Sequence, residues 1–204
     1  QGSALIGAGG LVPMYRLAGA DVIVSIDGDH LNSEGESVRL AGEFADGRRV
    51  STPGDKMNRL YSVEADLTLT GASADHRLRL GSSQMVAFAN ALAAELLGDA
   101  AGEEIITHLK KRGTKAGVGA KWVSEAAKDL VVAAKKGEAI VLAGSHLPAE
   151  AHILVYAINQ ALGANGKTIK YTEIAGDESE SLQDLIKALE AGEVVTLVFL
   201  GGNP

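Results

Sequence analysis

The sequence predicts an α/β protein with doubly wound, mainly parallel sheets and helices on both faces. Short β-branched runs alternate along the chain with longer runs whose apolar residues repeat at helical spacing, which is the pattern of βαβ units. Several of the strand-like runs end in glycine, where such a sheet turns into a helix or meets a ligand. The 204 residues, 46% of them hydrophobic, are enough to bury a core without disulfides.

The first half of the chain alternates predicted strands and helices. Residues 20–27 (ADVIVSID) form a near-continuous apolar run that suits a buried parallel strand. Apolar residues spaced three apart predict a short helix over residues 37–44, and residue 50 and residues 60–64 are expected to be extended. From residue 83 the apolar residues follow a helical period as far as Gly98, which is placed to end that helix.

The second half continues the alternation after an interruption. Residues 98–121 are rich in glycine and lysine, and they are predicted to be an irregular insert or a linker between two lobes. Beyond them the pattern predicts three helices and three strands in alternation. These are a helix over residues 122–134, a strand over 139–144, a helix over 149–162, a strand over 167–174, a helix over 181–191 and a last strand over 194–200.

Composition narrows the function classes. A net charge of −7 disfavours nucleic acid and anionic membranes as partners. The absence of cysteine excludes disulfides, cysteine-ligated zinc and iron-sulfur clusters within this chain. No apolar run approaches the roughly 18 to 20 residues that span a bilayer, so no direct membrane span is expected. Residues 1–3 (QGS) are expected to be the remnant of a tag, and residues 4–204 one α/β region excised from a larger protein.

Three predicted strands end in glycine at the edge where doubly wound sheets bind ligands. The glycines are Gly28, Gly144 and the pair Gly201-Gly202, which Asn203 follows. Each lets the backbone turn tightly or approach a ligand, next to a segment where a helix N-terminus could hold phosphate. Glycine after a strand is as common for turning as for binding, so the turn is the first interpretation at each position.

Polar residues beside these turns raise two further possibilities. Asp27, Asp29 and His30 could ligate a divalent metal, but their spacing matches no metal motif, so a turn held by aspartate hydrogen bonds is favoured. The pair Ser145-His146 lacks the second glycine of a nucleophile elbow. Neighbouring residues in an extended segment also point to opposite faces, so serine hydrolase chemistry is not expected there.

Asp75, His76 and Arg77 together have the composition of an active site. Adjacent residues on a strand diverge, so the three side chains are not expected to converge on one substrate. We expect Asp75 to cap or pair locally, with Arg77 and Arg79 on its side of the strand, and we favour a structural role. The basic run from His108 to Lys115 is interpreted as a solvated helix end or loop.

Six segments stand in an order that is similar to a known series. They are residues 20–30, 63–70 (VEADLTLT), 74–75, 79–83 (RLGSS), 163–167 (GANGK) and 201–204 (GGNP). The series resembles the molybdopterin guanine dinucleotide domains of the dimethyl sulfoxide reductase superfamily, to which formate dehydrogenase belongs. Those domains carry, in this order, Gly-x-Asn-Pro, Val-Asp-Pro-Arg-x-Thr-x-Thr, Ala-Asp, Arg-Pro-Gly-Thr-Asp, a Gly-Asn-x-Gly-Lys-like segment and a second Gly-x-Asn-Pro.

The ligand-facing positions depart from that pattern. The first Gly-x-Asn-Pro is Asp27-Gly28-Asp29-His30 here, Asp-Pro-Arg is Glu64-Ala65-Asp66, and the last aspartate of the glycine motif is Ser83. These changes place carboxylates near a diphosphate and remove an acid that would pair with guanine, so dinucleotide binding is expected to be severely weakened. The resemblance assigns any remaining cofactor contacts to Gly28, Gly81, Gly144, Gly201, Gly202 and Asn203.

One branch of the superfamily fits these departures. The phrases ADVIVSIDGDHL, MNRLYSVEADLTLTGASADHRL, GKTIKYTE and VTLVFLGGNP look like the large iron-sulfur subunit of alternative complex III, a bacterial quinol:electron-acceptor oxidoreductase. In that family the molybdopterin-like region holds no molybdenum cofactor. The resemblance therefore implies a non-catalytic scaffold fragment with no cofactor or metal of its own. It also implies contact with other subunits of a membrane-bound respiratory complex, on the extracytoplasmic (periplasmic) side of the inner membrane.

Two other functions remain open at this point. The chain could be part of an active molybdopterin oxidoreductase, with Gly201, Gly202 and Asn203 still cradling phosphate of molybdopterin guanine dinucleotide. It could also be a small nucleotide-binding α/β module unrelated to either family, an interpretation that depends on the glycine-ended strands alone.

Overall fold

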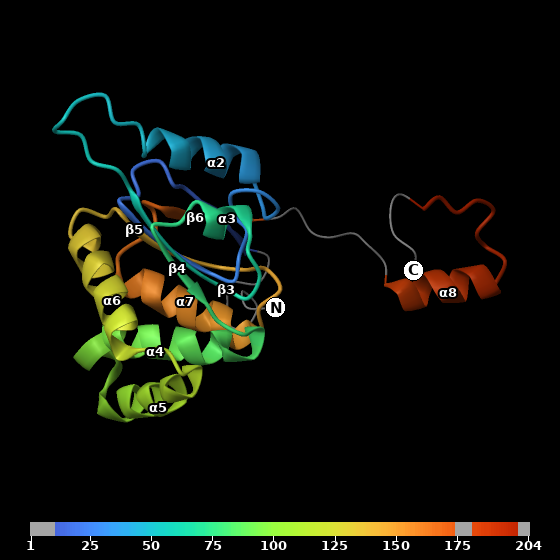
Figure 1. The fold of residues 1–204 in the computed structure, drawn as a ribbon. Helices are drawn as coiled ribbons and strands as arrows, with labels where there is room; N and C mark the ends of the chain where they lie inside the picture. The colour runs from blue at the N-terminus through green and yellow to red at the C-terminus, as the bar shows by residue number, and fades with distance from the viewer. Residues whose placement is uncertain (1–10, 174–180, 200–204) are drawn as a thin grey trace. The chain divides into compact units, whose positions relative to one another are not determined.

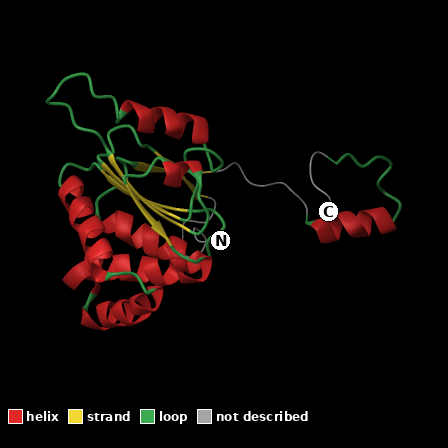
Figure 2. Ribbon diagram, in the orientation of Figure 1, coloured by secondary structure: helices red, strands yellow, loops and turns green. Residues whose placement is uncertain are grey.

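The computed structural model describes residues 11–173 and 181–199 of the chain. They fall into two compact units, Gln1–Glu173 and Ile174–Pro204. Within the first unit, a four-stranded parallel sheet carries helices on both faces (Figures 1 and 2). This arrangement confirms the predicted α/β class with a doubly wound parallel sheet.

The sheet has the strand order β4-β3-β2-β5, with β2 in an interior position. The strands are β4 (His76–Arg79), β3 (Arg59–Glu64), β2 (Val22–Ile26) and β5 (Ala139–Ala143), and every pair is parallel. All five residues of β2 and of β5 are buried, as expected for parallel strands that are covered on both faces.

Alternate residues of the sheet belong to two separate hydrophobic cores. Val24 and Val63 face a core formed with α4 (Met85–Leu97), α6 (Ala120–Ala134) and α7 (Ala149–Ala161). Ile23 faces the opposite core, which includes Leu40 and Phe44 of α2 (Ser37–Asp46). The period of two along each strand therefore places helices on both faces of the sheet.

A second, antiparallel sheet lies beside the α2 core. It pairs β1 (Leu11–Tyr15) with β6 (Ile169–Glu173), and Tyr15 lies opposite Ile169. The expected strand over residues 167–174 is therefore present, but it pairs outside the main sheet. Short helices complete the unit: α3 (Leu69–Ala72), η1 (Ser82–Gln84), η2 (Gly98–Ala101) and η3 (Thr114–Ala116).

The predicted irregular segment over residues 98–121 is instead largely helical. It contains α5 (Glu103–Gly113), which has two glutamates in its first turn and three basic residues in its last, as the helix dipole favours. The last residue of α5 explains part of the glycine content. A Cβ on Gly113 would lie 2.8 Å from Cα of Ala91 in α4, so this glycine permits close helix packing.

The second unit contains one described helix, α8 (Leu182–Glu190), and Ser181 caps its start by accepting a hydrogen bond from the Asp184 N–H. Residues 194–199 form no strand, contrary to the prediction over 194–200, whose last residue is outside the described range. A strand needs a neighbour for its backbone hydrogen bonds, and the described part of this unit supplies only a helix. In the part of the chain that the structure describes, no helix is long and apolar enough to cross a membrane.

Candidate functional site

The carboxyl ends of β2, β3 and β5 meet at one edge of the sheet, which we call the carboxyl edge. Parallel sheets bind ligands at this edge, where the strand order reverses. The loop after β2 begins with Asp27, the loop after β3 with Ala65, and the loop after β5 with Gly144. Gly28 and Gly144 therefore both lie at the predicted place, whereas Gly201, Gly202 and Asn203 lie outside the described residues.

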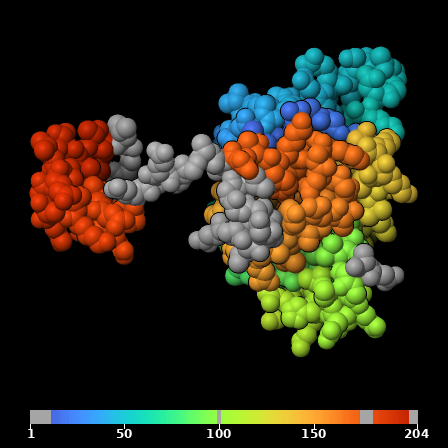
Figure 3. Space-filling model, turned by 180° about the vertical axis from the view of Figure 1, so that it is seen from behind, coloured from blue at the N-terminus to red at the C-terminus, as the bar shows by residue number. Residues whose placement is uncertain are grey.

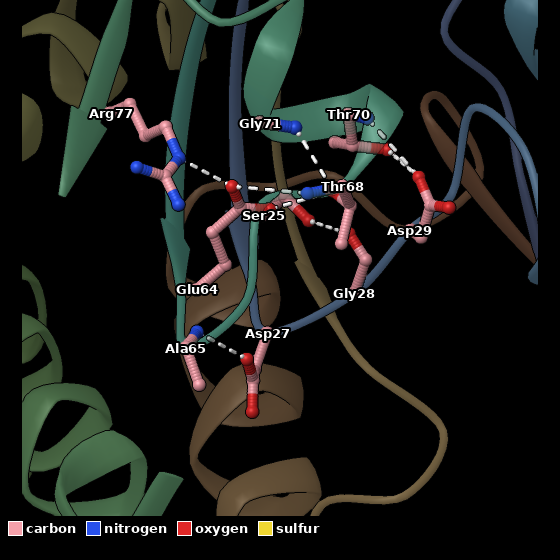
Figure 4. Close-up of polar contacts among 10 residues, drawn as sticks. All are labelled: Ser25, Asp27, Gly28, Asp29, Glu64, Ala65, Thr68, Thr70, Gly71 and Arg77. Atoms are coloured by element: carbon pink, nitrogen blue, oxygen red, sulfur yellow. Dashed lines mark hydrogen bonds and ion pairs between the residues drawn. The ribbon is translucent and has the colours of Figure 1, made fainter. Parts of the chain in front are cut away.

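Asp27 connects all three loops. Its Oδ1 accepts a hydrogen bond of 2.9 Å from the Ala65 N–H (Figure 4). Its Oδ2 lies 3.0 Å from Nε2 of His146. Its backbone has φ of +49°, which is uncommon for a residue other than glycine and is most often tolerated by aspartate and asparagine. The residue therefore adopts an unfavourable backbone conformation while its side chain joins three strand ends.

Asp29 binds the start of α3. Its Oδ1 accepts hydrogen bonds from the N–H and the hydroxyl of Thr70, at 3.1 and 2.9 Å (Figure 4). Its Oδ2 accepts one of 2.9 Å from Asn32 Nδ2. Burial alone would raise the pKa of Asp29, but these hydrogen bonds outweigh it and hold the pKa below its usual value. Asp29 is therefore an ionised turn residue.

Glu34 joins the loops after β2 and β5. Its Oε1 accepts a hydrogen bond of 3.0 Å from the Asp29 N–H, and its Oε2 accepts one of 2.8 Å from the Ser145 N–H. The second contact spans 111 residues of sequence. Glu34 was absent from the sequence prediction, because only the fold brings it to residue 145.

Glu64 links the end of β3 to β4 through an ion pair, and its side chain is only 1% exposed. Its Oε1 lies 2.5 Å from Nε of Arg77, and its Oε2 accepts a hydrogen bond of 2.6 Å from the Thr68 hydroxyl (Figure 4). A Cβ on Gly71 would lie 1.7 Å from Oε1 of Glu64, so only glycine fits beside the carboxylate. The acid at the Asp-Pro-Arg position is thus a buried structural group.

The carboxylates of Asp27, Asp29 and Glu34 share one feature: each accepts a backbone N–H from a loop or from the start of α3, at or beside the carboxyl edge. Such loop N–H groups are the donors that hold phosphate in nucleotide-binding α/β proteins. Here these donors already have anionic partners from the same chain. The carboxyl edge therefore does not fit the diphosphate of molybdopterin guanine dinucleotide, which would meet carboxylates in place of free donors.

The described glycines that were predicted to contact the cofactor lie close to other residues of the protein. A Cβ on Gly144 would lie 2.0 Å from the carbonyl oxygen of Asp27, and one on Gly28 would lie 2.4 Å from Nε2 of His30. Gly81, after β4, has the mildest constraint, since its Cβ would lie 3.3 Å from Gln84 Oε1. Internal packing thus accounts for glycine at 28 and 144 without a ligand.

The proposed metal ligands do not converge. Asp27 and Asp29 bind different loops, and His30 is only 3% exposed, with its Nε2 lacking a hydrogen-bond partner among the described residues. Over residues 11–173 and 181–199, no cluster of three or more histidine, aspartate or glutamate side chains has metal-binding geometry. The interpretation favoured from the sequence, a turn held by aspartate hydrogen bonds, describes this loop.

The three residues Asp75, His76 and Arg77 bind three different partners. Asp75 lies 2.7 Å from Arg48 and accepts a 2.8 Å hydrogen bond from the Leu60 N–H. The ring of His76 stacks on that of Tyr61, with centroids 4.6 Å apart, and Arg77 pairs with Glu64. The expected structural role fits these contacts. The prediction that Asp75 caps or pairs locally is wrong, because Arg48 and Leu60 lie 27 and 15 residues away in the sequence and only the fold brings them to it.

A cavity of about 650 Å³ adjoins the carboxyl edge. Its walls come from β1, β6, α2, α7 and the loops after β2 and β5. Figure 3 shows the outer surface of this region, where α7 and β6 (orange) meet β1 and α2 (blue). No local sequence pattern predicts this cavity, because its lining comes from both ends of the first unit.

Comparison with known proteins gives a likeness to a solved structure. No family model matches the chain, and no curated protein matches it. Among solved structures, acetylene hydratase from Pelobacter acetylenicus is similar, with a TM-score of 0.51 and 13% sequence identity. The match covers 78% of this chain and 24% of that protein, so the chain spans about a quarter of its structural neighbour. At this identity the likeness concerns the α/β fold alone.

Proposed function

We propose that this chain is a non-catalytic scaffold region, of the kind found in the large iron-sulfur subunit of alternative complex III, with a degenerate molybdopterin guanine dinucleotide site. One observation carries the proposal. The loop N–H groups at the carboxyl edge donate to Asp27, Asp29 and Glu34 at 2.8 to 3.1 Å, where a cofactor-binding domain would present them to phosphate.

Repulsion between like charges opposes binding of the dinucleotide at the carboxyl edge. A diphosphate oxygen placed about 4 Å from a carboxylate is repelled by about 4 kcal/mol at the effective dielectric constant of a protein surface. Asp29 remains ionised at neutral pH, because its hydrogen bonds outweigh burial and lower its pKa. Binding the dinucleotide would require breaking these contacts as well as overcoming the repulsion, and each lost backbone donor would need a new partner.

The scaffold role further proposes contact with other subunits of an extracytoplasmic respiratory complex. Helix α8 supports this part of the proposal, since Leu182, Ile186 and Leu189 recur at helical spacing and none of them is buried by the described part of their own unit. Apolar side chains gathered on one helix are typical of surfaces that bind another protein. Co-expression with the other subunits of such a complex, followed by affinity purification through this chain, tests the contact directly.

The cofactor experiment separates the scaffold from an active molybdopterin oxidoreductase. The chain is produced in a host that makes molybdopterin guanine dinucleotide, and the purified protein is assayed for molybdenum, pterin and guanine nucleotide. We expect none of the three at stoichiometric level. Titration with GDP by calorimetry is expected to show no saturation.

A reverting variant sharpens this test. Asp27→Gly with Asp29→Asn brings the loop after β2 closer to Gly-x-Asn-Pro and removes two carboxylates. We expect measurable GDP binding in this variant, whereas Asp46→Asn, an exposed charge change on α2, should leave GDP binding undetectable. Stoichiometric dinucleotide on the wild-type protein, or saturable GDP binding by it, would establish the active-enzyme or nucleotide-module alternative instead.

A further inference from the structure

The cavity beside the carboxyl edge has the size of a small-molecule site. Its volume of about 650 Å³ lies within the range of pockets that enclose drug-sized ligands. The two-stranded sheet of β1 and β6 lines part of it, and α7 lines another part. The scaffold proposal assigns no role to this space.

Aromatic rings dominate the lining. Three of the four tyrosines of the chain line the cavity: Tyr15, Tyr156 and Tyr171. Tyr171 lies opposite Pro13 in the β1-β6 register, two positions from Tyr15, so both side chains project from the same face of the two-stranded sheet. The ring of Tyr156 on α7 meets that of Tyr171 edge to face, with centroids 6.0 Å apart.

The phenol groups are available as hydrogen-bond donors. Burial, together with neighbouring phenols, raises the pKa of Tyr15 and of Tyr171, so both keep their protons at neutral pH. The Tyr156 hydroxyl accepts a hydrogen bond of 2.7 Å from Gln160 Nε2, which leaves its own proton free to donate. Three O–H donors therefore border one cavity.

A fourth ring adjoins these three. His30 lies edge to face with Tyr15, at a centroid distance of 5.8 Å. Burial lowers the pKa of His30 against the opposing effect of Glu34 and Asp29, so this ring is neutral. Two ring pairs, His30 with Tyr15 and Tyr156 with Tyr171, thus contribute to the lining of the cavity.

The charged side chains of the lining are engaged with one another or with backbone. Arg39 pairs with Glu36 and Glu43 at 2.5 Å each and donates to the Tyr15 carbonyl oxygen. Both oxygens of Glu34 hold loop N–H groups. Arg39 is the one arginine or lysine among the described lining residues, and it is already paired. Glu34 has no cation partner there and would repel an anion, although both its oxygens already accept N–H groups. A charged ligand would therefore lose its hydration, which is costly, without finding a vacant charged partner.

We propose that this cavity binds an uncharged, planar aromatic molecule that carries hydrogen-bond acceptors, such as ring carbonyl or hydroxyl oxygens. The tyrosine rings pack against its faces and edges, and the phenol hydroxyls donate to its oxygens. This inference is independent of the scaffold role, because a chain that binds no dinucleotide can still hold such a ligand.

Three probes of similar shape and different charge test the proposal. They are 2-naphthol, which is neutral at pH 7, 2-naphthalenesulfonate, an anion, and trimethyl(2-naphthyl)ammonium, a cation. Calorimetric titration of the full chain should show saturable binding of 2-naphthol, at least about ten-fold tighter than either ion. Tighter or equal binding of an ion, or no saturation by 2-naphthol, overturns the proposal.

Matched tyrosine variants locate the binding. Tyr171→Phe and Tyr156→Phe each remove one O–H donor and should weaken 2-naphthol binding about three- to ten-fold, the effect of one hydrogen bond. Tyr61→Phe makes the same change at the one tyrosine outside the cavity and should leave the affinity unchanged. Circular dichroism checks that each variant is folded. Unchanged affinity in both folded cavity variants would show that the probe binds elsewhere.

Discussion

Strand β5 is an edge of the four-stranded sheet, and a buried side chain takes the place of its missing neighbour. Asn159 on α7 is 2% exposed. Its Oδ1 accepts a hydrogen bond of 2.9 Å from the Val141 N–H, and its Nδ2 donates one of 2.7 Å to the Val141 carbonyl oxygen. Thr168 adds a hydrogen bond of 2.9 Å from its hydroxyl to the carbonyl oxygen of Ala139. The side chains thus satisfy outward-facing backbone groups that another strand would otherwise bind.

The substitution Asn159→Leu tests this account, because leucine has the same number and branching of side-chain heavy atoms but no polar atom. It leaves the N–H and the carbonyl oxygen of Val141 buried without partners. Each such group costs about 1 to 3 kcal/mol, so we expect the free energy of unfolding to fall by about 2 to 6 kcal/mol. The control is Gln160→Leu, the next residue on α7, which is exposed and should change stability by less than about 0.5 kcal/mol.

Urea unfolding followed by tryptophan fluorescence measures the loss. Trp122 is the single tryptophan, and it packs edge to face with Tyr61 and Phe88 at centroid distances of 5.5 and 5.6 Å. Its emission therefore reports on the first unit. A loss below about 1 kcal/mol would refute the argument that Asn159 completes the edge. Light scattering gives a second test, because an unsatisfied edge strand promotes pairing between molecules.

Three further changes follow from individual contacts, each measured by urea unfolding. Gly144→Ala places a Cβ 2.0 Å from a backbone carbonyl oxygen and should lower the free energy of unfolding by about 1 to 3 kcal/mol. The control is Gly42→Ala, in α2 with open space around it, which should raise the free energy of unfolding by about 0.5 to 1 kcal/mol. Equal effects of the two changes would contradict the packing argument. Burial alone would raise the pKa of Asp75, but hydrogen bonds from an arginine and a backbone N–H lower it. Its stabilisation is therefore complete at pH 7 and is lost as the pH falls below about 3.9, so the stability difference between wild type and Asp75→Asn should narrow towards pH 3; a constant difference would exclude this linkage. Arg77→Met leaves the buried carboxylate of Glu64 without its cation and should cost about 2 to 4 kcal/mol. Adding Glu64→Gln should recover part of this loss, and a further loss would show that the charge is not the cause.

Elements with a strong local pattern could be predicted from the sequence. The buried strands predicted over residues 20–27 and 139–144 are present as β2 and β5. A continuous β-branched run predicts a buried parallel strand whatever its position in the sheet. Strand β1 was not predicted, since LVPMY contains a proline and lacks alternation, and only its pairing with β6 makes it a strand. The error over residues 98–121 has a similar origin. There glycine indicated a loop, whereas Gly113 provides close packing against α4.

The sequence likewise predicts only part of the candidate site. The sequence places Asp27, Asp29 and Glu64 at strand ends, and the α/β pattern alone brings those ends to one edge. What each carboxylate binds depends on contacts between distant residues. His146 reaches Asp27 across 119 residues, and no local pattern reveals such a pair. Residue types at the carboxyl edge were therefore predictable, and their partners were not.

The internal carboxylates connect the loops at the carboxyl edge. A bound diphosphate would connect the loops after neighbouring strands by accepting their N–H groups. Asp27 and Glu34 make the same kind of connection, but their anionic groups are side chains of the protein. The connection between the loops therefore does not depend on the concentration of a ligand. The proposed ligand of the adjacent cavity differs in charge from a diphosphate, because the donors that line this cavity are neutral tyrosine hydroxyls.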